Sequence, residues 1–178
     1  MVLLCSGGID SLLSFHLLKD QIKHVVFFDY KQPARHQEHL AAIAIAEGLF
    51  GKKVTRIDTA DLSTKMSIGV GEKGSRVVPN RNLIMISIAH SLYNMPVVIG
   101  ANKDDYNDYE DCRPEYFEQL SKLLKCDIVH PLTSMTKKEI IDSIRKNKLP
   151  LDYTWSCYQP IHDKPCETCN SCKENAGL

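Results

Sequence analysis

A turn rich in glycine and serine near the start of the chain has the residue types of an anion site. An apolar stretch, residues 2–5, leads into Ser6-Gly7-Gly8-Ile9-Asp10-Ser11, and a second apolar stretch reaches residue 18. In a strand–turn–helix arrangement, free backbone N–H groups and the serine hydroxyls would face a bound phosphate. Asp10 would repel a phosphate, so we expect it to be either the helix N-cap or a ligand of Mg²⁺. The alternative is an ordinary Gly-Gly turn between a strand and a helix.

Four of the seven cysteines crowd into the last part of the chain, with the spacing C-x8-C-x2-C-x2-C. Two-residue gaps allow neighbouring thiolates to face one ion, and a more distant thiolate can complete a tetrahedron, as in structural zinc sites. Iron–sulfur ligation and redox cysteines are the alternatives. Because this stretch has few apolar residues, a bound metal would supply its folding energy. The expected ligands are Cys157, Cys166, Cys169 and Cys172.

The remaining cysteines and one histidine pair give weaker signals. We expect Cys5, Cys112 and Cys126 to be core or loop thiols. His36 and His39 lie three residues apart, but no third ligand is apparent, so they are interpreted as surface or cleft residues.

The hydrophobic pattern predicts strands alternating with helices. Strands are expected at residues 2–5, 24–29, 53–58, 97–99 and 127–130, and helices at 12–18, 37–49, 82–93, 114–125 and 136–146. This alternation favours an α/β fold with a doubly wound five-stranded parallel sheet. Residues 61–79 interrupt the rhythm with several glycines and basic residues, and we expect either a mobile loop that carries binding groups or a disordered connection.

Three polar stretches follow the ends of predicted strands, at residues 6–11, 29–35 and 102–113. In open parallel sheets, ligands bind at the carboxyl ends of the strands, so we expect these stretches to converge on one cleft. The alternative is that loops are polar in any case, and this explanation is strongest for residues 29–35.

Length and charge bound the kind of protein. The 178 residues suit one α/β domain at 1–178 that includes a zinc-binding tail at 155–178. Lys+Arg and Asp+Glu both number 22, so the formal net charge is +0 and a stable nucleic-acid complex is not expected. No apolar run reaches membrane-spanning length. The first strand runs directly into the glycine turn, which leaves no room for a cleaved signal peptide, so we expect a cytoplasmic protein.

The glycine turn resembles a known phosphate loop. It has neither the Gly-Lys-Ser/Thr of a Walker A loop nor the third glycine of the dinucleotide fingerprint. SGGIDS is similar to the pyrophosphate loop of the ATP pyrophosphatase superfamily, whose members split ATP between its α and β phosphates. The chain as a whole resembles the 7-cyano-7-deazaguanine synthase family through FDY at 28–30, VPNRNLIMISIA at 78–89, GANKDDYNDYEDCRPEYF at 100–117 and the cysteine tail.

This resemblance implies the adenine-nucleotide α-hydrolase type of fold, with ATP, Mg²⁺ and zinc as cofactors and a homodimeric assembly. It implies that ATP adenylates the carboxylate of 7-carboxy-7-deazaguanine and that ammonia then gives the amide. A second ATP would activate the amide oxygen, and loss of AMP would leave the nitrile, a queuosine precursor. Free ammonium or a separate partner would supply the nitrogen, since no glutaminase-like segment is visible.

The resemblance also implies a set of site residues. The expected catalytic residues are Ser6, Asp10, Ser11, Arg81 and Arg113. The expected ATP-binding residues are Cys5, Ser6, Gly7, Gly8, Ile9, Asp10, Ser11, Leu12, Phe28 and Asp29. The expected substrate-binding residues are Asn82, Asp104, Asp105, Asp111 and Arg113.

The chain departs from the family pattern at two places beside these residues. The family commonly has Gly-Gln after FDY, where this chain has Lys31-Gln32, and it has glycine where this chain has Asn80. An enzyme that stops at the amide is therefore one alternative. The others are a tRNA-modifying member of the superfamily, which would be expected to have a basic face, and an ATP-binding module without catalysis.

Overall fold

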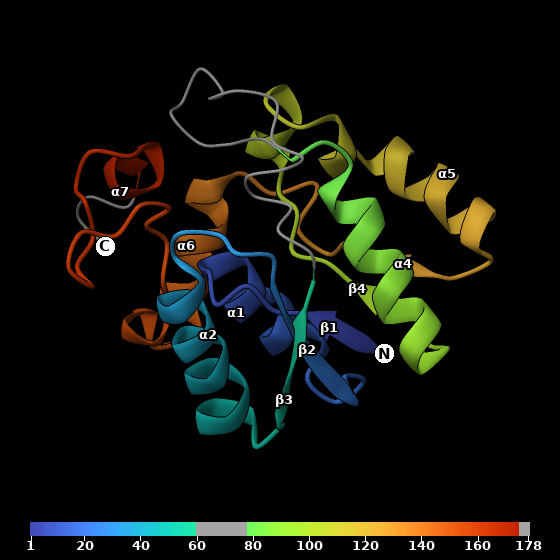
Figure 1. Ribbon diagram of the computed structural model, residues 1–178, viewed down its shortest axis with the longest axis horizontal. Helices are drawn as coiled ribbons and strands as arrows, with labels where there is room; N and C mark the ends of the chain where they lie inside the picture. Colours follow the sequence, from blue (N-terminus) through green and yellow to red (C-terminus); the bar gives the residue numbers. More distant parts are fainter. Residues whose placement is uncertain (60–77, 175–178) are drawn as a thin grey trace.

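The computed structural model describes residues 1–59 and 78–174. Its core is a five-stranded parallel sheet in the order β3-β2-β1-β4-β5 (Figure 1). The strands are β1 (Val2–Leu4), β2 (His24–Asp29), β3 (Val54–Asp58), β4 (Val97–Val98) and β5 (Ile128–Val129). In the register, Val2 lies opposite both His24 of β2 and Val97 of β4. The strand order therefore reverses between β1 and β4, and open sheets bind ligands at such a reversal.

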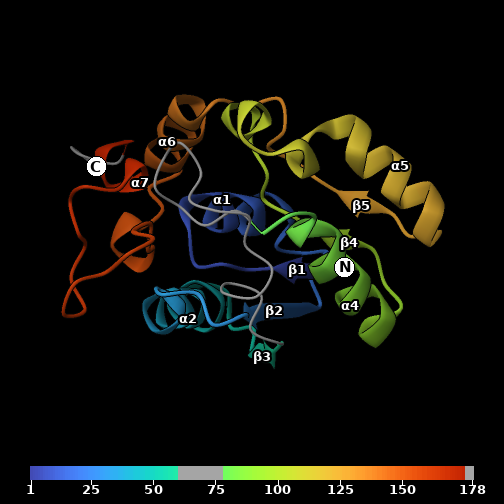
Figure 2. The same ribbon diagram turned by 45° about the horizontal axis from the view of Figure 1, so that its top comes forward.

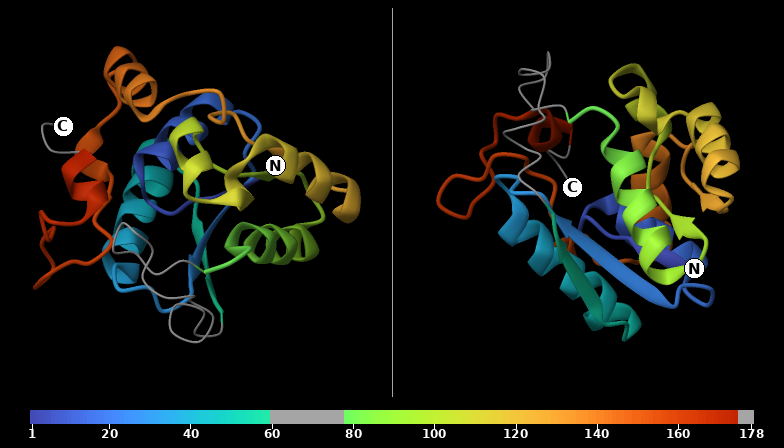
Figure 3. Two further views of the ribbon diagram at one scale, coloured as in Figure 1. Left: turned by 90° about the horizontal axis from the view of Figure 1, so that it is seen from above. Right: turned by 45° about the vertical axis from the view of Figure 1, so that its right-hand side comes forward.

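Helices cover both faces of this sheet (Figures 2 and 3). The α-helices of the main body are α1 (Ile9–Leu18), α2 (Arg35–Ile43), α4 (Arg81–Tyr93), α5 (Pro114–Leu124) and α6 (Lys137–Lys146). The described residues also form short elements: η1 (Ala44–Leu49), η2 (Lys103–Asn107), η3 (Glu110–Cys112), η4 (Leu151–Tyr153) and α7 (Asn170–Glu174). Among the described residues, no helix is both long and apolar enough to span a bilayer.

Alternating strand residues pack in two separate hydrophobic cores, because successive side chains point to opposite faces of a sheet. Leu3 and Val25 pack in one core with residues of α1, α2 and α6. Val2 and Val26 pack in the other with residues of α4 and α5. The expected doubly wound parallel sheet is therefore confirmed.

Most predicted elements are present, with differences at their ends. The predicted helix at 37–49 is instead α2 followed by the π-helical segment η1, and the 3₁₀ helices were not expected. The last strand is two residues long rather than four. The capping box at the start of α6 is present, because Thr136 Oγ1 accepts from Glu139 N and Glu139 Oε2 accepts from Thr136 N. Residues 61–77 of the predicted glycine-containing loop lie outside the described residues.

The two departures from the family pattern fall at special backbone positions. Lys31 has φ 64° and Asn80 has φ 53°, both in the left-handed region that favours glycine. Asparagine tolerates this region better than most residues, so Asn80 keeps the turn that precedes α4. Gln32 holds the loop after β2 by accepting from Tyr30 N and donating to Phe28 O and Glu38 Oε2.

We predict that Gly7→Ala destabilises the protein far more than Gly51→Ala. Both glycines have positive φ, which costs an L-residue about 1–2 kcal/mol. A Cβ on Gly7 would also lie 2.4 Å from Glu38 O and 2.8 Å from Ala41 Cβ, whereas a Cβ on Gly51 meets no atom of the described residues within 4 Å. Overpacking adds about 1–3 kcal/mol. Urea unfolding of both variants measures the difference, and equal losses would contradict this packing of the turn.

Candidate active site

A cavity of about 540 Å³ lies at the carboxyl ends of the central strands. It is bordered by the turn after β1, the end of β2, the start of α4 and the turn after β4. The three polar stretches that follow strand ends thus contribute to one cavity, through residues such as Ser6, Gln32 and Asp105. The expected convergence is therefore present.

The glycine turn is closed by its two serines. Ser6 N donates to Ser11 Oγ at 3.0 Å, and the two hydroxyl oxygens lie 3.2 Å apart. The N-cap of α1 is Gly8, and no side chain in the described part of the protein caps this helix end. Asp10 is therefore not the N-cap, and the first of the two roles considered for it is wrong. The amino end of α1 meets the cavity through Gly8, Ile9 and Asp10, as an anion site would require.

The Asp10 carboxylate is paired on one oxygen only, as far as the described residues extend. Its Oδ2 accepts from Lys137 Nζ at 2.8 Å and from Asn102 Nδ2 at 3.4 Å. Its Oδ1 is buried and has no hydrogen-bond partner among the described residues. A buried carboxylate oxygen without a donor is an unfavourable arrangement that a cation would relieve. Asp10 thus fits the second role, that of a Mg²⁺ ligand.

A second polar group surrounds the start of α4. Arg81 Nη1 donates to Tyr30 OH at 3.1 Å, and its Cζ lies 5.7 Å from the centroid of that ring. Asn82 N donates to Asp111 Oδ2 at 3.0 Å, while Asn82 Nδ2 donates to Asp111 O and, at 3.4 Å, to Cys112 Sγ. Burial raises the pKa of the Cys112 thiol to about 12, so it is protonated at neutral pH. These contacts fix the guanidinium of Arg81 on the cavity wall.

Two further carboxyl groups in the wall have raised pKa values. Burial, and next the nearby Asp10, raise the pKa of Asp105 to about 6. Burial also raises the pKa of Glu38, against the hydrogen bond that it accepts from Gln32 Nε2 at 2.8 Å. The cavity lining therefore combines three cations, Lys31, Arg81 and Lys137, with several acids, of which Asp105 and Glu38 have raised pKa values.

Not every expected site residue reaches the cavity. The predicted residues that line it are Cys5, Ser6, Gly8, Ile9, Asp10, Ser11, Phe28, Arg81, Asn82, Asp105 and Asp111. The expected residues outside its lining are Gly7, Leu12, Asp29, Asp104 and Arg113.

The outlying residues have other contacts. Leu12 is fully buried in the core, and Asp29 is buried against Arg56, with Oδ2 and Nη2 2.5 Å apart. Asp104 Oδ2 accepts from Lys137 N at 2.7 Å, so it positions the lysine. Arg113 is exposed and donates from Nε to Tyr106 O at 3.3 Å.

Several lining residues were not among the expected site residues, namely Lys137, Glu38, Trp155 and Tyr158, whereas Tyr30 and Tyr109 lie in two of the polar stretches that were expected to converge. One signal was available for Lys137. The capping box at Thr136 makes it the first residue of a helix that follows β5, and such a position lies at the carboxyl edge of the sheet. The others needed tertiary structure, because Glu38 lies on α2 and Trp155 and Tyr158 lie in the segment that carries the cysteines.

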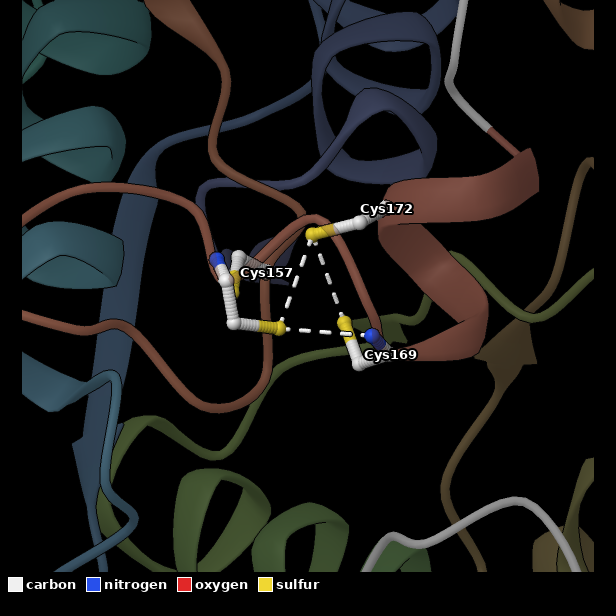
Figure 4. Close-up of side chains that lie close together, drawn as sticks. Cys157, Cys169 and Cys172 are labelled. Carbon is white, nitrogen blue, oxygen red and sulfur yellow. Dashed lines mark hydrogen bonds between the residues drawn. The ribbon is translucent and has the colours of Figure 1, made fainter.

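The four cysteines of the tail lie close together, and Figure 4 shows three of them, Cys157, Cys169 and Cys172, facing one another. Their sulfur atoms all lie within 4.8 Å of one another, with Cys169 Sγ 3.4 Å and Cys166 Sγ 4.0 Å from Cys172 Sγ. Tetrahedral zinc with bonds of about 2.3 Å requires sulfur separations of about 3.8 Å. Hydrogen bonds, first from Thr168, lower the pKa of Cys166 to about 6 and favour its thiolate. The cluster therefore has the composition and size to hold a metal ion.

We predict that Cys169→Ser loses the metal, whereas Cys126→Ala retains it. Cys126 is a buried cysteine outside the cluster, whose Sγ donates to Met95 O at 3.5 Å, so it controls for loss of a cysteine. Elemental analysis of the purified variants measures the bound metal. Metal retained at the wild-type level in Cys169→Ser would contradict four-thiolate binding.

We predict that Asp105→Asn changes the pH dependence of stability. A raised carboxyl pKa stabilises the fold below the unfolded value of 3.8, and this stability is lost as pH rises through about 6. As the pH rises from acid to neutral, the free energy of unfolding of the Asn variant should therefore increase by about 2–3 kcal/mol relative to that of the wild type. Urea unfolding across this range, without divalent cations, measures the gain. A difference independent of pH would contradict the raised pKa.

Comparisons with known proteins agree with this fold and these motifs. The family model for "Queuosine biosynthesis protein QueC" matches residues 1–177. Proteins named 7-cyano-7-deazaguanine synthase are 32% identical in Thermoplasma acidophilum, over 96% of this chain and 83% of that protein, and 32% identical in Prochlorococcus marinus strain AS9601, over 97% and 90%.

A solved structure of NMN synthetase from Francisella tularensis has the same fold, with a TM-score of 0.56 and 17% identity, over 93% of this chain and 69% of that one. The family model covers almost every residue, including the glycine turn and the four cysteines. The chain therefore belongs to the QueC family of queuosine biosynthesis enzymes.

Proposed function

We propose that this protein is an ATP-dependent ligase that converts 7-carboxy-7-deazaguanine and ammonia into 7-cyano-7-deazaguanine. The carboxylate attacks the α-phosphorus of ATP and releases pyrophosphate, and ammonia then displaces AMP to give the amide. The amide oxygen attacks the α-phosphorus of a second ATP and releases pyrophosphate, and loss of AMP and a proton then leaves the nitrile. Each of the two steps consumes one ATP.

One observation carries this proposal: the uncapped amino end of α1, preceded by a glycine turn, faces the cavity at the strand-order reversal. Its N–H groups and dipole suit the leaving pyrophosphate. The serine hydroxyls of Ser6 and Ser11 lie in the same turn and can donate to phosphate oxygens. No side chain need act as a covalent nucleophile, so catalysis would rest on positioning and charge stabilisation.

Asp10 would hold Mg²⁺ in this reaction. The test of fit is its Oδ1, which is buried without a donor among the described residues and is a ligand type that Mg²⁺ prefers. When bound, Mg²⁺ offsets negative charge on the phosphates. The cysteine cluster leaves no open position for substrate, so we propose that it holds a structural zinc ion.

Lys137 would offset part of the negative charge that develops on the departing pyrophosphate. Its ammonium lies 2.8 Å from Asp10 Oδ2 and thus beside the glycine turn. Asp104 accepts from its backbone N–H and fixes the start of α6. When phosphate enters, the ammonium can exchange its contact with Asp10 for one with a phosphate oxygen.

Arg81 would face the acceptor carboxylate and then the amide. It is held by Tyr30, while the adjacent Asn82 is held by Asp111 and Cys112. Asp105 and Asp111 line the cavity and would accept hydrogen bonds from the ring N–H and amino groups of the acceptor. Free ammonium or a separate partner supplies the nitrogen. We also propose a homodimer, on the basis of the family resemblance alone, and a cytoplasmic location.

Mass spectrometry of the products tests the proposal. The protein is incubated with 7-carboxy-7-deazaguanine, ATP, Mg²⁺ and ammonium, and AMP is counted against each deazapurine. We expect the nitrile with two AMP. Accumulating amide with one AMP would favour the shorter reaction, and absence of both AMP and conversion in a folded, metal-loaded protein would contradict the proposal.

We predict that Lys137→Met lowers kcat/KM about a hundredfold or more, because loss of a preorganised charge at a reacting centre has this magnitude. Lys138→Met is the matched control. Lys138 is exposed and stands next in the chain, outside the cavity lining, so its loss should change the rate by about twofold at most. Steady-state AMP formation measures both. Equal effects of the two variants would contradict the role of Lys137.

A further inference from the structure

One wall of the cavity is built by the segment that carries the metal cluster. Trp155, Ser156, Tyr158 and Gln159 line the cavity, and so does Ser171. These residues alternate with cysteines of the cluster, since Cys157 separates Ser156 from Tyr158, and Ser171 directly precedes Cys172. The positions of the thiolates therefore determine where this part of the wall lies.

The wall is also tied to the glycine turn. Trp155 N donates to Gly7 O at 2.9 Å, and Trp155 Nε1 donates to Cys157 O at 2.8 Å. Farther along the tail, Gln37 Nε2 donates to Asp163 Oδ1 at 2.5 Å and joins the tail to α2. The backbone of Trp155 is thus tied to the turn, and its indole is tied to the first cysteine ligand.

The side chain of Tyr158 belongs to the Arg81 side of the cavity. Burial, and next the nearby Tyr109, raise the pKa of its hydroxyl, while the nearby Arg81 lowers it, so the hydroxyl lies in the wall although the residue as a whole is 45% exposed. A large aromatic ring left this exposed at a cavity wall is available to a planar ligand. Aromatic side chains stack on fused heterocycles with about 1–3 kcal/mol per base.

We infer that Trp155 and Tyr158 form the acceptor wall, on which the planar fused ring of the acceptor stacks while ATP occupies the glycine turn. This inference rests on the proposed function for the identity of the acceptor. The wall makes Tyr158 a specificity-determining residue: its loss weakens acceptor binding and leaves the binding of ATP unchanged. The metal cluster acts on affinity only by holding this wall in place.

Trp155 is the one tryptophan of the sequence, so its fluorescence reports on the wall directly. The full metal-loaded chain is titrated separately with 7-carboxy-7-deazaguanine, guanine and α,β-methylene-ATP, and calorimetry gives each Kd. The variant is Tyr158→Leu. The control is Tyr153→Leu, which removes a partly exposed tyrosine of the preceding η4 that lies outside the cavity lining.

We expect binding of 7-carboxy-7-deazaguanine to quench the fluorescence of Trp155. Tyr158→Leu should raise the Kd of 7-carboxy-7-deazaguanine about tenfold, in line with the loss of one stacking contact. Tyr153→Leu should not raise it, and neither variant should alter the Kd of the ATP analogue or the metal content. An unchanged acceptor Kd in Tyr158→Leu, or an equal loss of acceptor and ATP-analogue binding, would overturn the acceptor wall.

The guanine titration separates this inference from the proposed function. If the wild-type protein binds guanine but not 7-carboxy-7-deazaguanine, the proposed substrate is wrong. The effect of Tyr158→Leu on guanine binding then still tests whether the acceptor wall exists. If the wild-type protein binds the ATP analogue but neither 7-carboxy-7-deazaguanine nor guanine, the inference of an acceptor wall is wrong as well.

Discussion

The close approach of Gly7 to α2 is the contact on which the site depends. A side chain at Gly7 would overlap Glu38 O and Ala41 Cβ, so only glycine allows the turn and the helix to lie this near each other. The carbonyl of the same residue accepts from Trp155 N and thereby anchors the tail. One residue thus places three parts of the cavity: the anion-binding turn, the first turn of α2 with Glu38, and the wall that carries the cysteines.

Charge inside the cavity is balanced rather than basic, in keeping with the formal net charge of the whole chain. Lys137 pairs with Asp10, and burial raises the pKa values of Asp105 and Glu38. A triphosphate arriving with its cation would replace these internal pairings with new ones of similar strength. Such an exchange allows binding without leaving a buried charge unpaired in either state, which would be costly.

The sequence predicts the sheet and its order of elements well, because buried parallel strands are continuous apolar runs and the glycine turn and capping box are local signals. It also predicts that four cysteines meet, since their spacing alone constrains the geometry. It does not predict the π-helical segment after α2, which depends on packing. It places Asp29 at the site although Arg56, distant in the chain, turns that carboxylate into a buried ion pair.

The residues missed at the site share a cause. Glu38 comes from α2, and Trp155 and Tyr158 come from the tail that carries the cysteines, and nothing local distinguishes them from surface residues. Family resemblance supplies the chemistry of the turn and the cysteines, but the neighbours of each motif are set by tertiary contacts. The departures at Lys31 and Asn80 illustrate the same limit, since only the backbone angles reveal that both keep a left-handed turn.

The central claim is that the acceptor oxygen attacks the α-phosphorus of ATP in this cavity. The most direct measurement uses 7-carboxy-7-deazaguanine labelled with ¹⁸O at both carboxylate oxygens, followed by mass spectrometry of the nucleotide products. We predict that each AMP carries one ¹⁸O, the first from the carboxylate and the second from the amide. Unlabelled AMP, or ADP with labelled phosphate, would contradict this claim.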